Sequence, residues 1–183
     1  TATACAQVFN ATGLAALAGE RVTVLDAEAL PIAEYANCGP RPQRFKTLLA
    51  PALLGEVDAR ISVAPFKRTM LNDAPLISAT IKNLFGLLSR SRYHGRSPHA
   101  RGQLHVPNVH AVIVDVYHTL GMRFDYGIVD LHDKYVSDDW QPDRGRAIPV
   151  GKVLCGTDLL ALDRAACAVA GEAECGYMRL LAH

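Results

Sequence analysis

The sequence predicts a layered α/β domain, in which a mostly parallel or mixed sheet is covered by helices on both faces. Short β-branched runs alternate along the chain with apolar runs of helical length, which is typical of this class. The β-branched runs are apolar at successive positions, as expected of strands buried on two sides. The chain has 183 residues, enough for one domain with a sizeable core, so we expect residues 1–183 to form a single domain.

Four short segments have the composition of strands. They are RVTVLD (21–26), ARISVA (59–64), YGIVDL (126–131) and GKVLCG (151–156). Longer stretches rich in Pro, Gly or charged residues separate the elements and are predicted loops: 31–43, 89–107 and 132–149. Long loops in a compact domain are often functional.

The segment NVHAVIVDVYHTLG is a predicted helix, although it is rich in β-branched residues. Its apolar side chains recur at helical spacing, at Val109, Val112, Ile113, Val116 and Leu120. Asn108 is a suitable N-cap and Gly121 a suitable C-cap. TDLLALDRAACAVAG is a second predicted helix, which begins at a Thr157 or Asp158 cap and ends at Gly171.

SATIKNLFGLLS is a third predicted helix, and it carries a lysine beside its apolar stripe. The stripe consists of Ile77, Ile81, Leu84 and Leu88. Lys82 lies about 100° round the helix from Ile81, at the edge of the stripe. We expect its aliphatic stem to border the core while its ammonium points into a crevice. Like Gly19, Gly55, Gly121 and Gly171, Gly86 follows an apolar run and is a predicted C-cap.

Composition excludes several classes of function. A net charge of +1 gives no overall field toward nucleic acid, and no apolar run is long enough to span a membrane. The first ten residues do not have the zones of a signal peptide, so we expect a cytoplasmic protein. The five cysteines include no C-x-x-C, so this chain is expected to hold free thiols and no iron–sulfur cluster of its own.

A basic window without acidic residues stands out in this nearly neutral chain. No Asp or Glu occurs between Asp73 and Asp115, whereas the window contains Lys82, Arg90, Arg92, Arg96 and Arg101. Arginine suits phosphate and carboxylate because its planar fork donates two hydrogen bonds at once. The window therefore indicates an anion site, and the alternative is a solvated basic loop.

Four histidines lie in the same window, at positions 94, 99, 105 and 110. Their spacings of five and six residues do not match the i, i+3 or i, i+4 spacing of helical zinc ligands. A loop can still bring a histidine and a carboxylate to one metal, and His94 and Asp130 are the candidates. Otherwise His94 is an anion ligand or an ordinary loop residue.

Carboxylates follow two of the predicted strands, where ligands of α/β sheets usually bind. Asp130 ends the strand 126–131, and Asp158 follows the strand 151–156. Asp158 is either a helix N-cap or part of a site. Asp163 lies within a helix, so we expect it to be exposed or paired with Lys67 or Lys82. No nucleophile elbow, P-loop or dinucleotide fingerprint occurs.

Taken in order, several of these segments resemble the DUF362 family, a domain of unknown function. The resemblance lies in DARISVAPFKRT, SATIKNLFGLL, YHGR, FDYGIVDL, PVGKVLCGTDLLALDRAACAVAG and GYMRLL, and it covers residues 58 to 180. Positions that match the family's motifs are Pro65, Lys67, Lys82, Asn83, Gly86, His94, Asp130, Asp158, Ala161 and Asp163.

The resemblance implies a bacterial or archaeal protein from an iron–sulfur-associated neighbourhood, without a known reaction. Family members often carry, or lie beside, 4Fe–4S ferredoxin-type modules, so a cluster is expected on an adjacent domain or partner. This chain departs from the family at Thr69, where a histidine is usual, and it lacks the family's opening strand. We therefore interpret the chain as a fragment of a longer protein.

Two functional hypotheses follow. In the first, the domain is an enzyme, or the substrate domain of one, that binds a small anionic ligand or a metal in a strand-end crevice. Its candidate catalytic residues are Lys67, Lys82, Asp130 and Asp163. That site gathers Lys67, Lys82, Asn83, His94, Asp130, Asp158 and Asp163, with Arg96 as support. Lys82 and His94 grip the anion, while Asp130 or Asp163 orients a lysine or holds the metal. In the second, the basic loop 89–107 docks a ferredoxin-like partner and the domain is not an enzyme.

Overall fold

The computed structural model describes residues 5–71, 74–95, 101–139 and 144–182. Its strands are β1 (Ile32–Ala36), β2 (Thr47–Pro51), β3 (Ile61–Leu71), β4 (Ala74–Ser78), β5 (Tyr126–Val136) and β6 (Arg146–Gly156). Its α-helices are α1 (Cys5–Ala11), α2 (Thr80–Asn83), α3 (Val109–Thr119), α4 (Leu159–Ala170) and α5 (Gly176–Leu181). Short 3-10 helices include η1 (Leu14–Leu17), η2 (Ala27–Ala29), η4 (Leu84–Leu87) and η5 (Gly102–His105).

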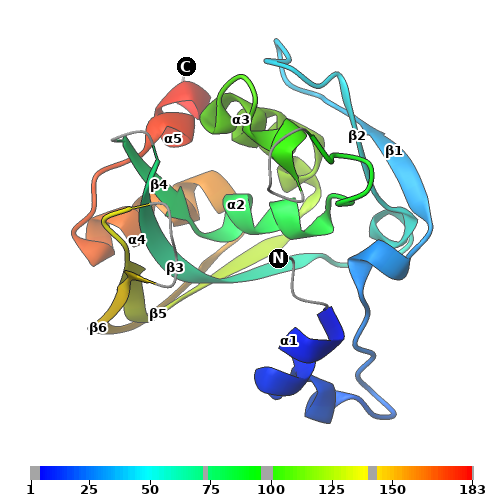
Figure 1. Cartoon of the computed structure of the whole chain (residues 1–183), viewed down its shortest axis with the longest axis horizontal. Helices are drawn as coiled ribbons and strands as arrows, with labels where there is room; N and C mark the ends of the chain where they lie inside the picture. The colour runs from blue at the N-terminus through cyan, green and yellow to red at the C-terminus, as the bar shows by residue number, and fades with distance from the viewer. Residues whose placement is uncertain (1–4, 72–73, 96–100, 140–143, 183) are drawn as a thin grey trace.

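A mixed four-stranded sheet organises the domain, in the order β4-β3-β5-β6. β3 and β5 run parallel, while β4 and β6 are antiparallel to their neighbours. β1 and β2 form a separate antiparallel pair, which lies to one side of the helices in Figure 1. The predicted α/β class with a mixed sheet and packed helices is therefore confirmed.

The helices pack on one face of this sheet. Along β3, Ser62, Ala64 and Phe66 are buried, whereas Ile61 and Val63 are more than half exposed, at 54% and 58%. α2 and α4 meet on the buried face, since both contact the space beside Gly127 of β5. α3 packs in turn on α2 and α5 (Figure 1). Helical cover on both faces was expected, but in the described part of the chain the second face is open.

Three predicted strands and two predicted helices are confirmed. Residues 59–64, 126–131 and 151–156 lie in or overlap β3, β5 and β6, although each real strand has 11 residues. α3 begins after the Asn108 cap, as predicted. α4 begins after the Asp158 cap and ends at Gly171, whose φ of 66° is the expected left-handed conformation. β1, β2 and β4 were missed.

The other predictions need correction. Residues 21–26 form no strand, because only Val22 makes a bridge, to Gly19, and Val22 and Leu25 are exposed. Positive φ occurs at Gly13, Gly151 and Gly171, so the remaining predicted glycine caps do not adopt the left-handed conformation. The third predicted helix is short: β4 ends at Ser78, and α2 continues into η4. Its stripe, Ile77, Ile81, Leu84 and Leu88, is nevertheless buried.

Candidate functional site

Lys82 lies on α2, and the position of α2 is set by a buried carboxylate on α4. Asp163 is fully buried. Its Oδ1 accepts hydrogen bonds from the N–H (2.8 Å) and hydroxyl (2.6 Å) of Thr80. Its Oδ2 accepts from the Ile81 N–H (3.2 Å) and the Tyr177 hydroxyl (3.0 Å). A buried carboxylate with four donors is well satisfied, so Asp163 fixes the first turn of α2.

This arrangement corrects the expected role of Asp163. Both expected alternatives are wrong: Asp163 is buried and not exposed, and its carboxylate oxygens bind Thr80, Ile81 and Tyr177 in place of Lys67 or Lys82. Burial raises the pKa of Asp163, while the donated hydrogen bonds act in the opposite direction. Burial, followed by the charge of Asp163, raises the pKa of Tyr177 well above its usual value. Asp163 is therefore a structural anchor for the turn that carries Lys82.

The Lys82 side chain is half-buried, beside two other cations. Its Nζ lies 3.8 Å from the centre of the Phe85 ring, one turn further along the chain. Burial, together with the smaller effects of the Arg101 and Lys67 charges, lowers the pKa of Lys82 to about 8. No carboxylate among the described residues forms an ion pair with this ammonium. The surroundings of Lys82 therefore have an excess of positive charge.

Asn83 and Lys67 occupy the same region in different ways. The Asn83 amide donates to the Val63 carbonyl (3.1 Å) and to Ser62 Oγ (3.3 Å), which ties α2 to β3. Lys67 is exposed on β3, just after a register irregularity between Pro65 and Lys67 in the pairing with β5. Lys67 is close enough for its charge to act on Lys82. Asn83 is therefore a positioning contact, and Lys67 extends the group of cations.

Asp130 lies on the other side of the sheet. It alternates with buried Val129 and Leu131 on β5, so its exposed side chain lies on the open face, away from α2. Its Oδ1 accepts the N–H of His132 (2.9 Å), where the pairing of β5 with β6 shifts register between Leu131 and Asp133. The predicted strand-end cluster is therefore divided, because strand alternation sends Asp130 and the α2 residues to opposite faces.

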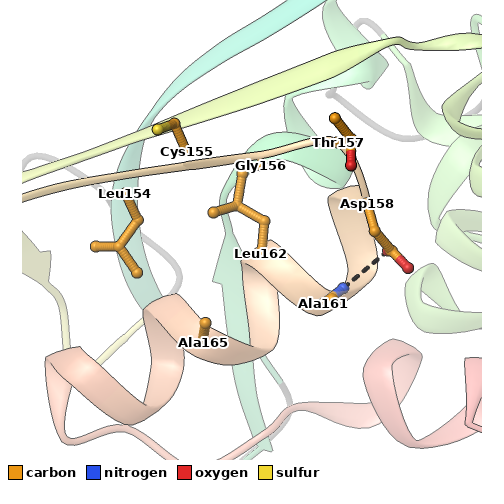
Figure 2. A pocket seen from close by; sticks show the side chains of 8 residues that line it. All are labelled: Leu154, Cys155, Gly156, Thr157, Asp158, Ala161, Leu162 and Ala165. Atoms are coloured by element: carbon orange, nitrogen blue, oxygen red, sulfur yellow. Dashed lines mark hydrogen bonds between the residues drawn. The ribbon is translucent and has the colours of Figure 1, made fainter.

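Asp158 is the N-cap of α4. Its Oδ1 accepts the N–H groups of Leu160 (2.8 Å) and Ala161 (3.0 Å), the second of which is drawn in Figure 2. Asp158 also borders an open groove of about 460 Å³ between β6 and α4. Leu154, Leu162 and Ala165 make this groove mainly apolar (Figure 2). The capping alternative explains this aspartate.

His94 is exposed, and its carbonyl accepts a hydrogen bond from the Gln103 amide (2.7 Å). Arg96 lies outside the described residues. Within the described part of the chain, no three or more His, Cys, Asp or Glu side chains are grouped so as to hold a metal ion. His94 and Asp130 therefore do not form part of such a group.

The five cysteines are free thiols, and Cys167 and Cys175 are buried.

Glu28, which sequence reasoning did not single out, shapes this region together with Arg101 of the basic window. Glu28 of η2 contacts the basic window, where its carboxylate accepts the N–H of Arg90 (2.5 Å) and the hydroxyl of Ser89 (3.3 Å). Arg101 lies near both Glu28 and Lys82. The basic window signalled Arg101, but no local signal links Glu28 to a segment 61 residues later.

A second buried carboxylate, Asp115 of α3, organises a loop beside the helices. Its Oδ1 accepts from the Gln43 N–H (2.8 Å) and the Asn37 amide (3.0 Å), and its Oδ2 from the N–H groups of Arg44 (2.7 Å) and Phe45 (2.8 Å). Asp115 thus anchors the β1–β2 connection to α3. An aspartate within an apolar helical stripe was the available signal for such a role.

Comparison with known proteins agrees with the resemblance seen in the sequence. No curated protein and no solved structure matches the chain. In the structure, no described helix is long and apolar enough to cross a membrane. The profile of the family described as "Domain of unknown function (DUF362)" matches residues 1–168. Since this match covers most of the 183 residues, the chain belongs to the DUF362 family.

Proposed function

We propose that this DUF362 domain binds a small anionic ligand at the cations around α2, namely Lys67, Lys82 and Arg101. The observation that carries the proposal is the half-buried ammonium of Lys82, which lies near two like charges and forms no ion pair with a carboxylate of the described residues. Grouped like charges destabilise one another, so an anion that bridges them relieves the repulsion. The ligand would be a phosphate or carboxylate compound, since these groups match lysine and arginine donors.

The geometry around Lys82 supports this use. The Asp163 anchor and the Asn83 contacts hold α2 in place, so Lys82 is presented from a rigid turn. Arg101 is held separately, because its Nε donates to the Leu88 carbonyl (2.6 Å) and its Nη2 to the Gly86 carbonyl (3.1 Å). Preorganised donors lose little conformational entropy when a ligand binds. His94 and Arg96, also predicted as ligand residues, are not needed for this core of three cations.

Titration with inorganic phosphate in a calorimeter tests the proposal. The wild-type chain should bind phosphate, and Lys82→Ala should weaken binding by about tenfold or more, the usual loss for a charge-assisted contact. Lys152→Ala is the matched control, since Lys152 is an exposed lysine on β6. The proposal fails if Lys82→Ala binds phosphate as the wild type does, or if the two lysine variants weaken binding equally.

The iron–sulfur setting stays a prediction. A ferredoxin-like partner or an adjacent 4Fe–4S module would need a docking surface, and the sequence predicts the 89–107 loop for it. Arg92 of this loop is exposed, whereas the Arg90 N–H is bound to Glu28. Salt-sensitive association that is lost on neutralising Arg92 would support this second role.

A further inference from the structure

The carboxylate of Glu28 is bound in the way that a ligand carboxylate would be. Its Oε1 accepts the Arg90 N–H at 2.5 Å and lies 3.7 Å from Arg101 Nη2, and its Oε2 accepts the Ser89 hydroxyl at 3.3 Å. A backbone N–H, a hydroxyl and a guanidinium thus converge on one anion. We refer to Ser89, the Arg90 N–H and Arg101 as the oxyanion cradle.

The cradle is built by the body of the domain and not by Glu28. Ser89 is 8% exposed, and its hydroxyl lies 2.9 Å from that of Ser91. The Arg101 guanidinium is positioned by the carbonyls of Gly86 and Leu88, at the end of η4. These contacts do not involve Glu28, so the cradle does not depend on it for its shape.

The segment that carries Glu28 is attached differently. No residue of α1, η1 or η2 is buried, and the apolar side chains of Val8, Leu14, Leu17, Val22 and Leu25 are exposed. In Figure 1, α1 lies apart from the sheet and its covering helices. A segment without buried apolar side chains has little hydrophobic free energy holding it in place. The Glu28 contacts are therefore a large part of what attaches this segment to the cradle.

The cradle adjoins the proposed anion site through Arg101, whose charge acts on Lys82. Glu28 brings one negative charge next to Arg90 and Arg101, and the charge of Arg101 in turn acts on Lys82. A ligand with a phosphate or a carboxylate would accept from the three donors of the cradle, which are the Ser89 hydroxyl, the Arg90 N–H and Arg101. It would also reach toward Lys82. Glu28 and such a ligand would then compete for one cradle.

We propose that the oxyanion cradle is part of the ligand site and that Glu28 closes it as an internal competitor, so that a phosphate or carboxylate ligand binds by displacing the N-terminal segment. This inference rests on the proposed anion-binding function. The apparent affinity of a site equals its intrinsic affinity multiplied by the fraction of molecules in which the site is open. Removing Glu28 should therefore strengthen ligand binding, which is the opposite of what loss of a ligand contact would do.

The test compares the affinities of wild type, Glu28→Ala and Glu20→Ala for inorganic phosphate and, separately, for succinate. Glu20 is an exposed glutamate in the same segment and serves as the control. We expect Glu28→Ala to bind the preferred anion about tenfold more tightly than wild type, and Glu20→Ala to bind like wild type. The tighter of the two anions distinguishes a phosphate ligand from a carboxylate ligand.

The outcomes separate this inference from the function on which it rests. If neither wild type nor Glu28→Ala binds either anion, the anion-binding function itself fails. If wild type binds through Lys82 but Glu28→Ala binds equally or more weakly, only the competition is overturned.

Hydrogen exchange gives a second measurement that needs no variant. Saturating phosphate should release η2 from Ser89 and Arg90, and an isolated turn of this length is not stable by itself. Exchange of the Ala29 amide, which donates to the Asp26 carbonyl within η2, should therefore become faster. Unchanged or slower exchange at Ala29 in the phosphate-bound protein would show that the segment stays in place, and would overturn the displacement.

Discussion

The Thr80 hydroxyl donates a 2.6 Å hydrogen bond to Asp163 Oδ1, and so joins the start of α2 to the middle of α4. The two residues are 83 positions apart in the chain, and both are fully buried. α2 has only four residues, too few to be stable by itself. The position of Lys82 on this turn therefore depends on a carboxylate contributed by another helix.

Replacing Asp163 by Asn should destabilise the fold. The Asn amide would place an NH2 donor where Asp163 Oδ2 now accepts, so the Ile81 N–H and the Tyr177 hydroxyl could not both keep an acceptor. We expect a loss of about 2–3 kcal/mol in the free energy of unfolding, as for buried hydrogen bonds to a charged group. Urea denaturation measures it.

Asp158→Asn is the control on the same helix. Asn and Asp are nearly equivalent N-caps, so this change should alter stability by less than about 0.5 kcal/mol. Equal effects of the two substitutions would contradict the anchoring role of Asp163.

Asp115→Ala should loosen the β1–β2 connection. The substitution leaves the partly buried N–H groups of Gln43, Arg44 and Phe45 without their acceptor. The cost of each should lie below the roughly 1–3 kcal/mol of a fully buried unsatisfied donor, because water can reach it in part. Hydrogen exchange at these three amides should become faster than in wild type. Asp125→Ala, which removes a more exposed acceptor from the Arg60 N–H, should leave them protected. Unchanged exchange in Asp115→Ala would refute the prediction.

Two glycines that face each other across β5 and β6 should respond differently to Ala. A Cβ at Gly127 would lie 2.7 Å from methyl carbons of Leu159 and Leu162, whereas a Cβ at Gly156 would have its nearest neighbour at 4.0 Å. Gly127→Ala should therefore destabilise the protein by about 1–3 kcal/mol through overpacking. Gly156→Ala should be neutral or stabilising by up to about 1 kcal/mol, because alanine restricts the unfolded chain.

Thermal or urea denaturation of both variants distinguishes these effects. Equal stabilities would mean that α4 does not pack closely against β5 at Gly127.

Anion binding should weaken as pH rises through the pKa of Lys82. That pKa is lowered to about 8, mainly by burial, so the ammonium loses its proton at lower pH than an exposed lysine would. Below this pH affinity should be constant, and above it affinity should fall by up to about tenfold per pH unit. Sulfate is a suitable probe because its own charge does not change in this range.

Lys82→Arg supplies the control for this pH dependence. Arginine keeps its charge, so the variant's affinity should stay level between about pH 7 and about pH 9. A wild-type affinity that is equally level would show that Lys82 does not provide the binding charge.

The sequence alone predicted a helix or strand correctly where the pattern that indicates the element lies within one segment. Helical spacing, the Asn108 cap and the Asp158 cap determined α3 and α4, because periodicity and capping are local properties. The β-branched runs located β3, β5 and β6, although the strands extend into polar residues because ladder pairing continues beyond the apolar core. Residues 21–26 were mistaken for a strand because composition does not show whether a partner strand exists.

The sequence by itself determined the α/β class, family membership and the apolar stripe that places Lys82 at the edge of the core. Only the tertiary structure decided which polar groups meet. It joined Asp163 to Thr80, turned Asp130 to the open face of the sheet, and brought Glu28 to the basic window. These contacts join distant segments, and a hydrogen bond forms only where folding has placed donor and acceptor within about 3 Å of each other.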